Sequence, residues 1–148
     1  MFFAQEYIPD LDALDWDRCE NNNKDYLDTP QHNQLGILCG FWERLMSLMD
    51  VEGAAVALID EDQSEGLHRF FDQYADFLID YITRMKKICD IDGVLIHDDW
   101  GHQNGAFFSL DTAMEMFVPY LSSCLYCSWS RSLVSTGYQR CKNACRKI

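Results

Sequence analysis

The sequence predicts an α/β fold with parallel strands. Two short apolar runs, 34–39 (QLGILC) and 93–97 (GVLIH), have the length of strands and lack the polar alternation of a sheet with one solvated face. Between them, residues 64–89 carry apolar side chains at helical spacing, and another helical pattern begins after residue 109. Because strands that alternate with helices usually run side by side in one direction, we expect a parallel sheet covered by helices.

The first third of the chain is expected to be loop followed by one strand–helix unit. Residues 1–33 are acidic and rich in turn-forming residues, so we predict mostly loop with at most one short element. The strand over 34–39 ends at Gly40. Residues 41–49 (FWERLMSLM) then have a helix-like apolar face, and a second short helical stretch is expected over 51–59.

The clearest predicted element is a long amphipathic helix over 64–89. Its apolar side chains recur at intervals of three and four residues, and Ser64 is a plausible N-cap. Three bases gather in its last turns, where they favour the negative end of the helix dipole: Arg84, Lys86 and Lys87. The pattern breaks at residue 90, just before the second strand.

The second strand leads into a polar loop and then a helix. Residues 98–105 are polar and contain two glycines. Ser109 and Asp111 fit the N-cap and first turn of a helix that runs to Val118, and Pro119 should bend or divide it.

Charge and apolar run length exclude several classes of protein. The formal net charge of −12 repels phosphate backbones, so we expect no nucleic-acid partner and no binding to anionic membranes. No apolar run approaches the roughly 18 to 20 residues that cross a bilayer, and the N-terminus does not resemble a signal peptide. We therefore expect a cytoplasmic protein with reduced thiols.

The C-terminal end differs from the rest of the chain. All 24 acids lie at or before Glu115, whereas five of the 12 bases and four of the seven cysteines come later. The spacing of those cysteines suits a tetrahedral zinc site: Cys124, Cys127, Cys141 and Cys145. Alternatively, the serine-rich composition after Leu121 indicates a disordered or non-native end. The sequence leaves both readings open.

Candidate site residues lie where the second strand ends. Ligands of α/β proteins bind at the carboxyl ends of the strands, which is where Asp98 and Asp99 fall. Either carboxylate could bind a cationic or hydrogen-bonding group, act as a general base, or contact a metal. The plainer alternative is that they only accept hydrogen bonds from loop amides. Polar and aromatic neighbours complete the cluster: His97, Trp100, His102 and Gln103.

Residues 40–121 resemble the uroporphyrinogen decarboxylase superfamily. The segments that carry the likeness are GFWERLMSLMDVEGAAVALID, the long helix through MKKICDIDGVLIHDDWGHQNGAFFS, and EMFVPYL, with HDDWG, Ser109 and the Pro119-Tyr120 pair as its most specific parts. That superfamily joins the decarboxylases of porphyrin biosynthesis to corrinoid-dependent methyltransferases, all on a (β/α)8 TIM barrel.

The resemblance implies a fragment, because a complete barrel needs about 250 residues. It divides the chain into an acidic segment (1–33), a partial barrel domain (34–121) and a Cys/Ser-rich basic tail (122–148). We expect these 148 residues alone to be inactive and to aggregate or associate through unpaired strand edges.

For the parent enzyme, the resemblance implies a lyase that decarboxylates a tetrapyrrole without a cofactor. The alternative is a methyltransferase that acts on a methylated small molecule with a corrinoid (cobalamin) protein and zinc. Asp98 and Asp99 would be catalytic, and His97, Trp100, His102 and Gln103 would bind substrate; no metal ligands are assigned in this chain. A different, non-enzymatic hypothesis is that the chain is an independent interaction module that binds zinc through its C-terminal cysteines.

Overall fold

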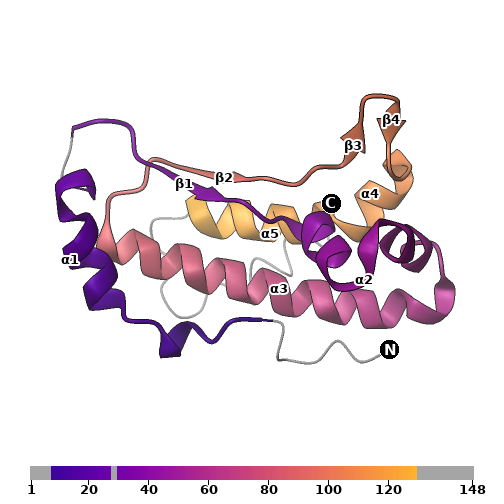
Figure 1. Cartoon of the computed structure of the whole chain (residues 1–148), viewed down its shortest axis with the longest axis horizontal. Helices are drawn as coiled ribbons and strands as arrows, with labels where there is room; N and C mark the ends of the chain where they lie inside the picture. The colour runs from indigo at the N-terminus through magenta and orange to yellow at the C-terminus, as the bar shows by residue number, and fades with distance from the viewer. Residues whose placement is uncertain (1–7, 28–29, 130–148) are drawn as a thin grey trace.

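A computed structural model describes residues 8–27 and 30–129 of the chain, and most of them are helical (Figure 1). The elements in chain order are a 3-10 turn η2 (Leu11–Ala13), α1 (Trp16–Leu27), β1 (Gln34–Ile37), α2 (Phe41–Ala57), α3 (Glu61–Ile88), β2 (Gly93–Ile96), β3 (Gly101–His102), β4 (Gly105–Ala106), α4 (Leu110–Met116) and α5 (Val118–Trp129). None of the helices in these ranges combines the length and apolarity needed to cross a bilayer.

The predicted fold class, a fragment of an α/β TIM barrel, is wrong. The described residues form two sheets of two strands each, instead of the array of parallel strands that a barrel requires. β1 and β2 pair in parallel from Gln34 with Gly93 to Ile37 with Ile96, and β3 and β4 form a small antiparallel hairpin. The physical reason is that the helices bury most of the apolar surface against one another, so the strands of residues 8–27 and 30–129 form one parallel pair.

The β1–β2 sheet is covered on one face only. Leu35, Ile37, Val94 and Ile96 pack against the core, whereas Leu95 is 44% exposed on the other face. Leu38, one residue beyond β1, is 80% exposed. The absence of polar alternation predicted strands covered on both faces, and the described residues leave the outer face open.

α3 is the central element of the molecule. Figure 1 shows α5 alongside α3 on the side nearer β1 and β2, with the segment that carries η2 on the opposite side of α3. Its apolar stripe is buried as its periodicity predicts: Leu67, Phe70, Phe71, Tyr74, Ala75, Leu78 and Ile82. The N-cap is Asp60 instead of Ser64; its carboxylate accepts a hydrogen bond from the Asp62 amide at 3.0 Å.

α2 contains the two helical stretches that the sequence predicts, joined at a kink. Asp50 has a φ of 60°, which a non-glycine residue rarely adopts, and it interrupts the helix after Met49. The Asp50 carboxylate accepts a hydrogen bond from the Gly53 amide at 2.8 Å and so caps the second stretch.

The Ser109 cap of α4 and the helix break next to Pro119 both occur where the sequence predicts them. Ser109 caps α4 by accepting a hydrogen bond from the Thr112 amide at 3.1 Å. Pro119 lies in the first turn of α5, where its missing N–H removes no intrahelical hydrogen bond. α5 continues beyond Leu121 to Trp129 and buries Ser123 and Cys124. Residues 130–148 of the predicted tail lie outside the described residues.

Candidate functional site

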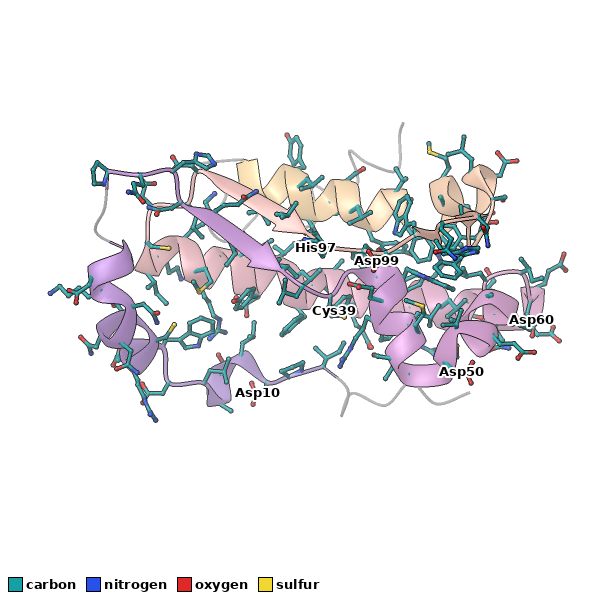
Figure 2. All side chains as sticks on the ribbon, turned by 45° about the horizontal axis from the view of Figure 1, so that its top comes forward. Asp10, Cys39, Asp50, Asp60, His97 and Asp99 are labelled. Atoms are coloured by element: carbon teal, nitrogen blue, oxygen red, sulfur yellow. The ribbon has the colours of Figure 1, made fainter. Side chains whose placement is uncertain are left out.

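The parallel pairing of β1 and β2 brings two chain segments together at one edge of the sheet. Both strands end at this edge, and the His97 amide donates to the Ile37 carbonyl at 2.8 Å just beyond the last strand pair. Figure 2 shows Cys39, His97 and Asp99 close to one another near the start of α2. We call this region, residues 38–43 and 97–103, the strand-end site.

The Asp98 side chain accepts three hydrogen bonds at the strand-end site. Its carboxylate accepts hydrogen bonds from the backbone amides of Trp42 (3.2 Å) and Glu43 (2.9 Å), and from the indole Nε1 of Trp100 (2.7 Å). α2 begins after Gly40, which has no side chain to cap it. Asp98 therefore caps α2 from a distant part of the chain and complements the positive end of its dipole.

Gly40 permits this cap because the two segments approach closely. A Cβ atom on Gly40 would lie 2.4 Å from the Asp98 Cγ and 2.7 Å from the His97 carbonyl oxygen. Any larger residue at position 40 would push the β2 end away from α2. The hydrogen bonds between Asp98 and the first turn of α2 therefore depend on glycine at this position.

The other predicted site residues are more exposed than Asp98 or are held mainly by aromatic contacts. His97 and Asp99 are exposed, and Trp100 is half-buried, with its ring 5.6 Å from that of Phe108. His102 and Gln103 are exposed on the β3–β4 hairpin. The structure thus brings His97, Asp98, Asp99 and Trp100 together and places the other two on the adjoining hairpin. The catalytic and binding roles assigned to these residues stay predictions.

Two residues of the strand-end site, Cys39 and Glu43, and one that contacts it from α3, Tyr74, were not predicted from sequence. Cys39 follows β1 and is half-buried, and the hydroxyl of Tyr74 donates to the Cys39 carbonyl at 2.8 Å. Glu43 has a buried carboxylate oxygen, Oε2, with no hydrogen-bond partner among the described residues. The signal for Cys39 was available in principle, because it follows a strand just as Asp98 does.

Burial disfavours the charged forms of Tyr74 and Cys39. It raises the pKa of Tyr74 above its ordinary value, and the nearby Cys39 thiol raises that pKa further. Burial likewise raises the pKa of the Cys39 thiol. Since a thiolate is the reactive form of cysteine, this site is better suited to chemistry by its carboxylates and imidazole than to attack by Cys39.

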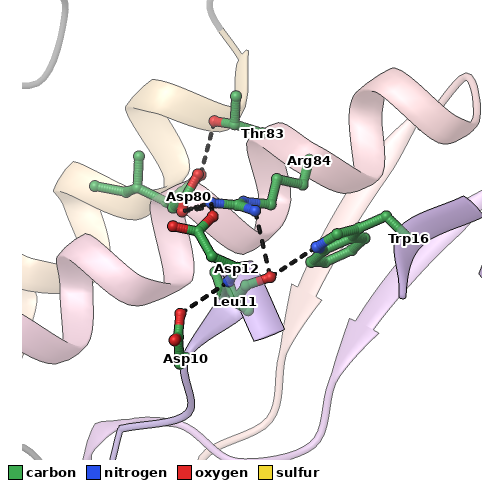
Figure 3. A network of polar contacts seen from close by, with 8 residues as sticks. Asp10, Leu11, Asp12, Trp16, Asp80, Thr83 and Arg84 are labelled. Atoms are coloured by element: carbon green, nitrogen blue, oxygen red, sulfur yellow. Dashed lines mark hydrogen bonds and ion pairs between the residues drawn. The ribbon is translucent and has the colours of Figure 1, made fainter. Parts of the chain in front are cut away.

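A separate groove lies along α3, away from the strand-end site. It runs between the N-terminal segment and one face of the helix, and it is lined by Ile8, Pro9, Asp10, Leu11, Asp12, Gln73, Asp76, Phe77, Asp80 and Arg84. Arg84 organises one end of the groove through ion pairs with Asp12 (2.6 Å) and Asp80 (2.9 Å) (Figure 3). The Trp16 indole donates to the Leu11 carbonyl beside it at 2.8 Å.

The proposed zinc ligands lie largely outside the described structure. Cys124 is buried in α5, with its Sγ atom 3.9 Å from the Ala75 carbonyl oxygen. The side chain of Cys127, and Cys141 and Cys145 altogether, fall outside the described residues. Within 8–27 and 30–129, no three side chains of His, Cys, Asp or Glu are grouped so as to hold a metal ion.

Comparisons with protein-family models, curated proteins and solved structures found no match to this chain.

Proposed function

We propose that the strand-end site binds the substrate of an enzyme of the uroporphyrinogen decarboxylase superfamily. The observation that supports the proposal is the unequal bonding of two adjacent carboxylates. Asp98 accepts three hydrogen bonds within the protein, whereas Asp99 is exposed next to it, with the exposed His97 on the other side of Asp98. Asp98 therefore positions the loop, and Asp99 and His97 contact the ligand.

The chemistry of these side chains suits a ligand with N–H donors. A carboxylate accepts hydrogen bonds only, so Asp99 would accept from a pyrrole N–H of a tetrapyrrole. The ring nitrogens of an imidazole can donate or accept hydrogen bonds, so His97 would bind the same ligand beside Asp99. Trp100 would form an apolar wall, since its ring is half-buried and its Nε1 is held by Asp98.

A corrinoid-dependent methyltransferase is the second candidate. The segment HDDWG followed by Gln103 looks more like the methyltransferase-type or uncharacterised branches of the superfamily, because the decarboxylases tend to carry a small hydroxyl residue near this point. In this case the strand-end site would face a methylated small molecule or a corrinoid protein. The two branches differ in ligand, so one binding experiment can separate them.

Anaerobic titration of the purified chain with uroporphyrinogen, followed by tryptophan fluorescence, tests the proposal. A charge-assisted hydrogen bond contributes about 1.5 to 3 kcal/mol, so Asp99→Asn should weaken binding about tenfold or more. Asp111→Asn is the matched control, because Asp111 is also exposed but lies in the first turn of α4.

Two results would contradict the decarboxylase proposal. One is an unchanged dissociation constant in Asp99→Asn, which would remove this residue from the ligand site. The other is absence of uroporphyrinogen binding to the unmodified chain. Binding of methylcobalamin with the same sensitivity to Asp99→Asn would favour the methyltransferase branch instead.

A further inference from the structure

The loop of the β3–β4 hairpin contains an asparagine followed by a glycine. The pairing of His102 with Gly105 closes the hairpin and leaves Gln103 and Asn104 as its loop. All four residues are exposed, and Figure 1 shows the hairpin at the outer edge of the molecule, away from α3. The sequence contains no other Asn-Gly pair. Because adjacent residues are joined covalently, the Asn104 side chain and the Gly105 backbone nitrogen are neighbours in every conformation of this loop.

The glycine leaves the backbone around its nitrogen open. Gly105 has a φ of 152°, a conformation that residues with a side chain rarely adopt. A Cβ atom built on Gly105 would have nothing within 4 Å. Any other residue at this position would place a side chain next to the nitrogen and shield it. The loop therefore combines an exposed side-chain amide with an unshielded backbone nitrogen.

The side chain of Asn104 is less restrained than those of other asparagines. Its backbone amide donates to His102 Nδ1 at 3.1 Å, but its side chain forms no hydrogen bond within residues 8–27 and 30–129. By contrast, the side chains of Asn23 and Asn33 each donate to a backbone carbonyl, at 2.7 Å and 3.1 Å. The Asn104 amide is therefore free to rotate toward the next backbone nitrogen.

We propose that Asn104 is a site of spontaneous deamidation, which converts it to aspartate and isoaspartate. The Gly105 nitrogen loses its proton to a solvent base and attacks Cγ of Asn104. The new C–N bond closes a succinimide ring, the bond from Cγ to Nδ2 breaks, and the leaving nitrogen takes a proton from solvent to form ammonia. Water then opens the ring and returns a proton to the Gly105 nitrogen. Addition of water at Cγ gives aspartate, and addition at the main-chain carbonyl gives isoaspartate. In total, water is consumed and ammonia is released, with no oxidation or reduction.

Both products change the hairpin that adjoins the strand-end site. Each replaces a neutral amide by a carboxylate, so a negative charge is added beside Gln103, one of the predicted binding residues. In isoaspartate the main chain also runs through the former side chain and gains one methylene group. Because loop length fixes the register of a hairpin, this product should weaken the β3–β4 pairing and the adjoining hydrogen bond from the Phe107 amide to the Trp100 carbonyl, which is 3.0 Å long.

Peptide mapping of the folded chain over time tests the proposal. The purified chain is incubated at mildly alkaline pH and physiological temperature, and its tryptic peptides are identified by mass spectrometry. Trypsin places Asn22, Asn33 and Asn104 on different peptides. We expect the peptide with Asn104 to convert from amide to acid several-fold faster than the other two. Fragmentation should locate both aspartate and isoaspartate at residue 104, and the rate should rise with pH because the attacking nitrogen must lose its proton.

The chain offers controls for exposure and for chemistry. Asn22 is also exposed but lies within α1, where the helix fixes the backbone and engages the following amide nitrogens. Asn104→Gln keeps a side-chain amide but would have to close a larger ring, so it should stay an amide under the same conditions. Isoelectric focusing should show the acidic shift of the unmodified chain slowed in Asn104→Gln and unchanged in Asn22→Gln.

Three results would overturn the proposal. One is that Asn104 converts no faster than Asn22 and Asn33 in the folded chain. Another is that it converts only after unfolding in urea, because the folded hairpin would then protect it. The third is aspartate without isoaspartate, since opening of a succinimide gives both. The map of the unmodified chain decides between these results even if a variant fails to fold.

Discussion

Replacement of Asp98 by alanine should destabilise the protein more than the loss of any exposed carboxylate at the strand-end site. The substitution removes three hydrogen bonds, to the Trp42 amide, the Glu43 amide and the Trp100 indole. Hydrogen bonds to a charged group contribute about 1.5 to 3 kcal/mol each, and loss of an N-cap costs about 0.5 to 2 kcal/mol. Because one half-buried carboxylate shares all three donors, these contributions do not add fully. We expect a loss of about 2 to 4 kcal/mol in the free energy of unfolding.

Urea unfolding followed by far-UV circular dichroism measures this loss. Asp99→Ala is the matched control, because it removes an exposed carboxylate from the next residue and should change the free energy by no more than about 0.5 kcal/mol. Asp98→Asn should fall between the two, since an amide keeps one acceptor oxygen but loses the charge. If Asp98→Ala and Asp99→Ala unfold at the same urea concentration with the same slope, the three hydrogen bonds of Asp98 do not stabilise the fold.

Three further predictions concern packing, burial and association. Gly40→Ala should cost about 1 to 3 kcal/mol by overpacking, whereas Gly36→Ala, with nothing within 4 Å of the added Cβ, should not destabilise; equal urea midpoints would contradict this. Burial raises the folded-state pKa of Tyr74, so the stability that this hydroxyl contributes is complete below its unfolded pKa of about 10 and is lost as the pH rises above that value. Tyr74→Phe should lower the free energy of unfolding by about 1 kcal/mol at neutral pH, because the hydrogen bond to the Cys39 carbonyl is lost, and should show a smaller loss of stability at alkaline pH. An identical alkaline loss of stability in both proteins would be contrary evidence. The open apolar face beyond β1 and β2 should promote association, so Leu38→Lys combined with Leu95→Lys should shift the chain toward monomer in size-exclusion chromatography, and an unchanged elution profile would count against that role.

Local patterns predicted individual elements well, because the forces that set them act over a few residues. The two apolar runs form β1 and β2 at nearly the expected positions, and they pair in parallel as expected. Ser109 caps α4, and the buried face of α3 follows its periodicity. The start of α3 was misplaced because Asp60 and Ser64 are both good N-cap residues and lie one turn apart.

The fold class could not be obtained from the same patterns. Strand–helix alternation indicates parallel pairing, but it does not say how many strands join a sheet, since this depends on contacts between distant segments. Here the apolar residues after β2, including Phe108 and Phe117, pack on Trp42 of α2 with ring centres 5.1 Å and 6.5 Å away. They complete a helical core and add no strand to the β1–β2 sheet.

The division of roles between the two adjacent aspartates also required the structure. The sequence presents Asp98 and Asp99 as equivalent, and both were predicted to be catalytic. The partners that distinguish them lie more than 50 residues earlier in the chain, in the first turn of α2. No local spacing rule connects those positions, whereas Gly40 after a predicted strand was a visible hint of a close approach.

In the proposed function, Asp98 holds the strand-end site in place while its exposed neighbours bind the ligand. Two-dimensional amide NMR of the chain during an anaerobic titration with uroporphyrinogen can separate these two roles. We expect the largest chemical-shift changes on His97, Asp99 and the Trp100 indole, whereas the first turn of α2 should keep its hydrogen-bonded shifts. Changes confined to the groove along α3, or no changes at saturating ligand, would contradict these roles.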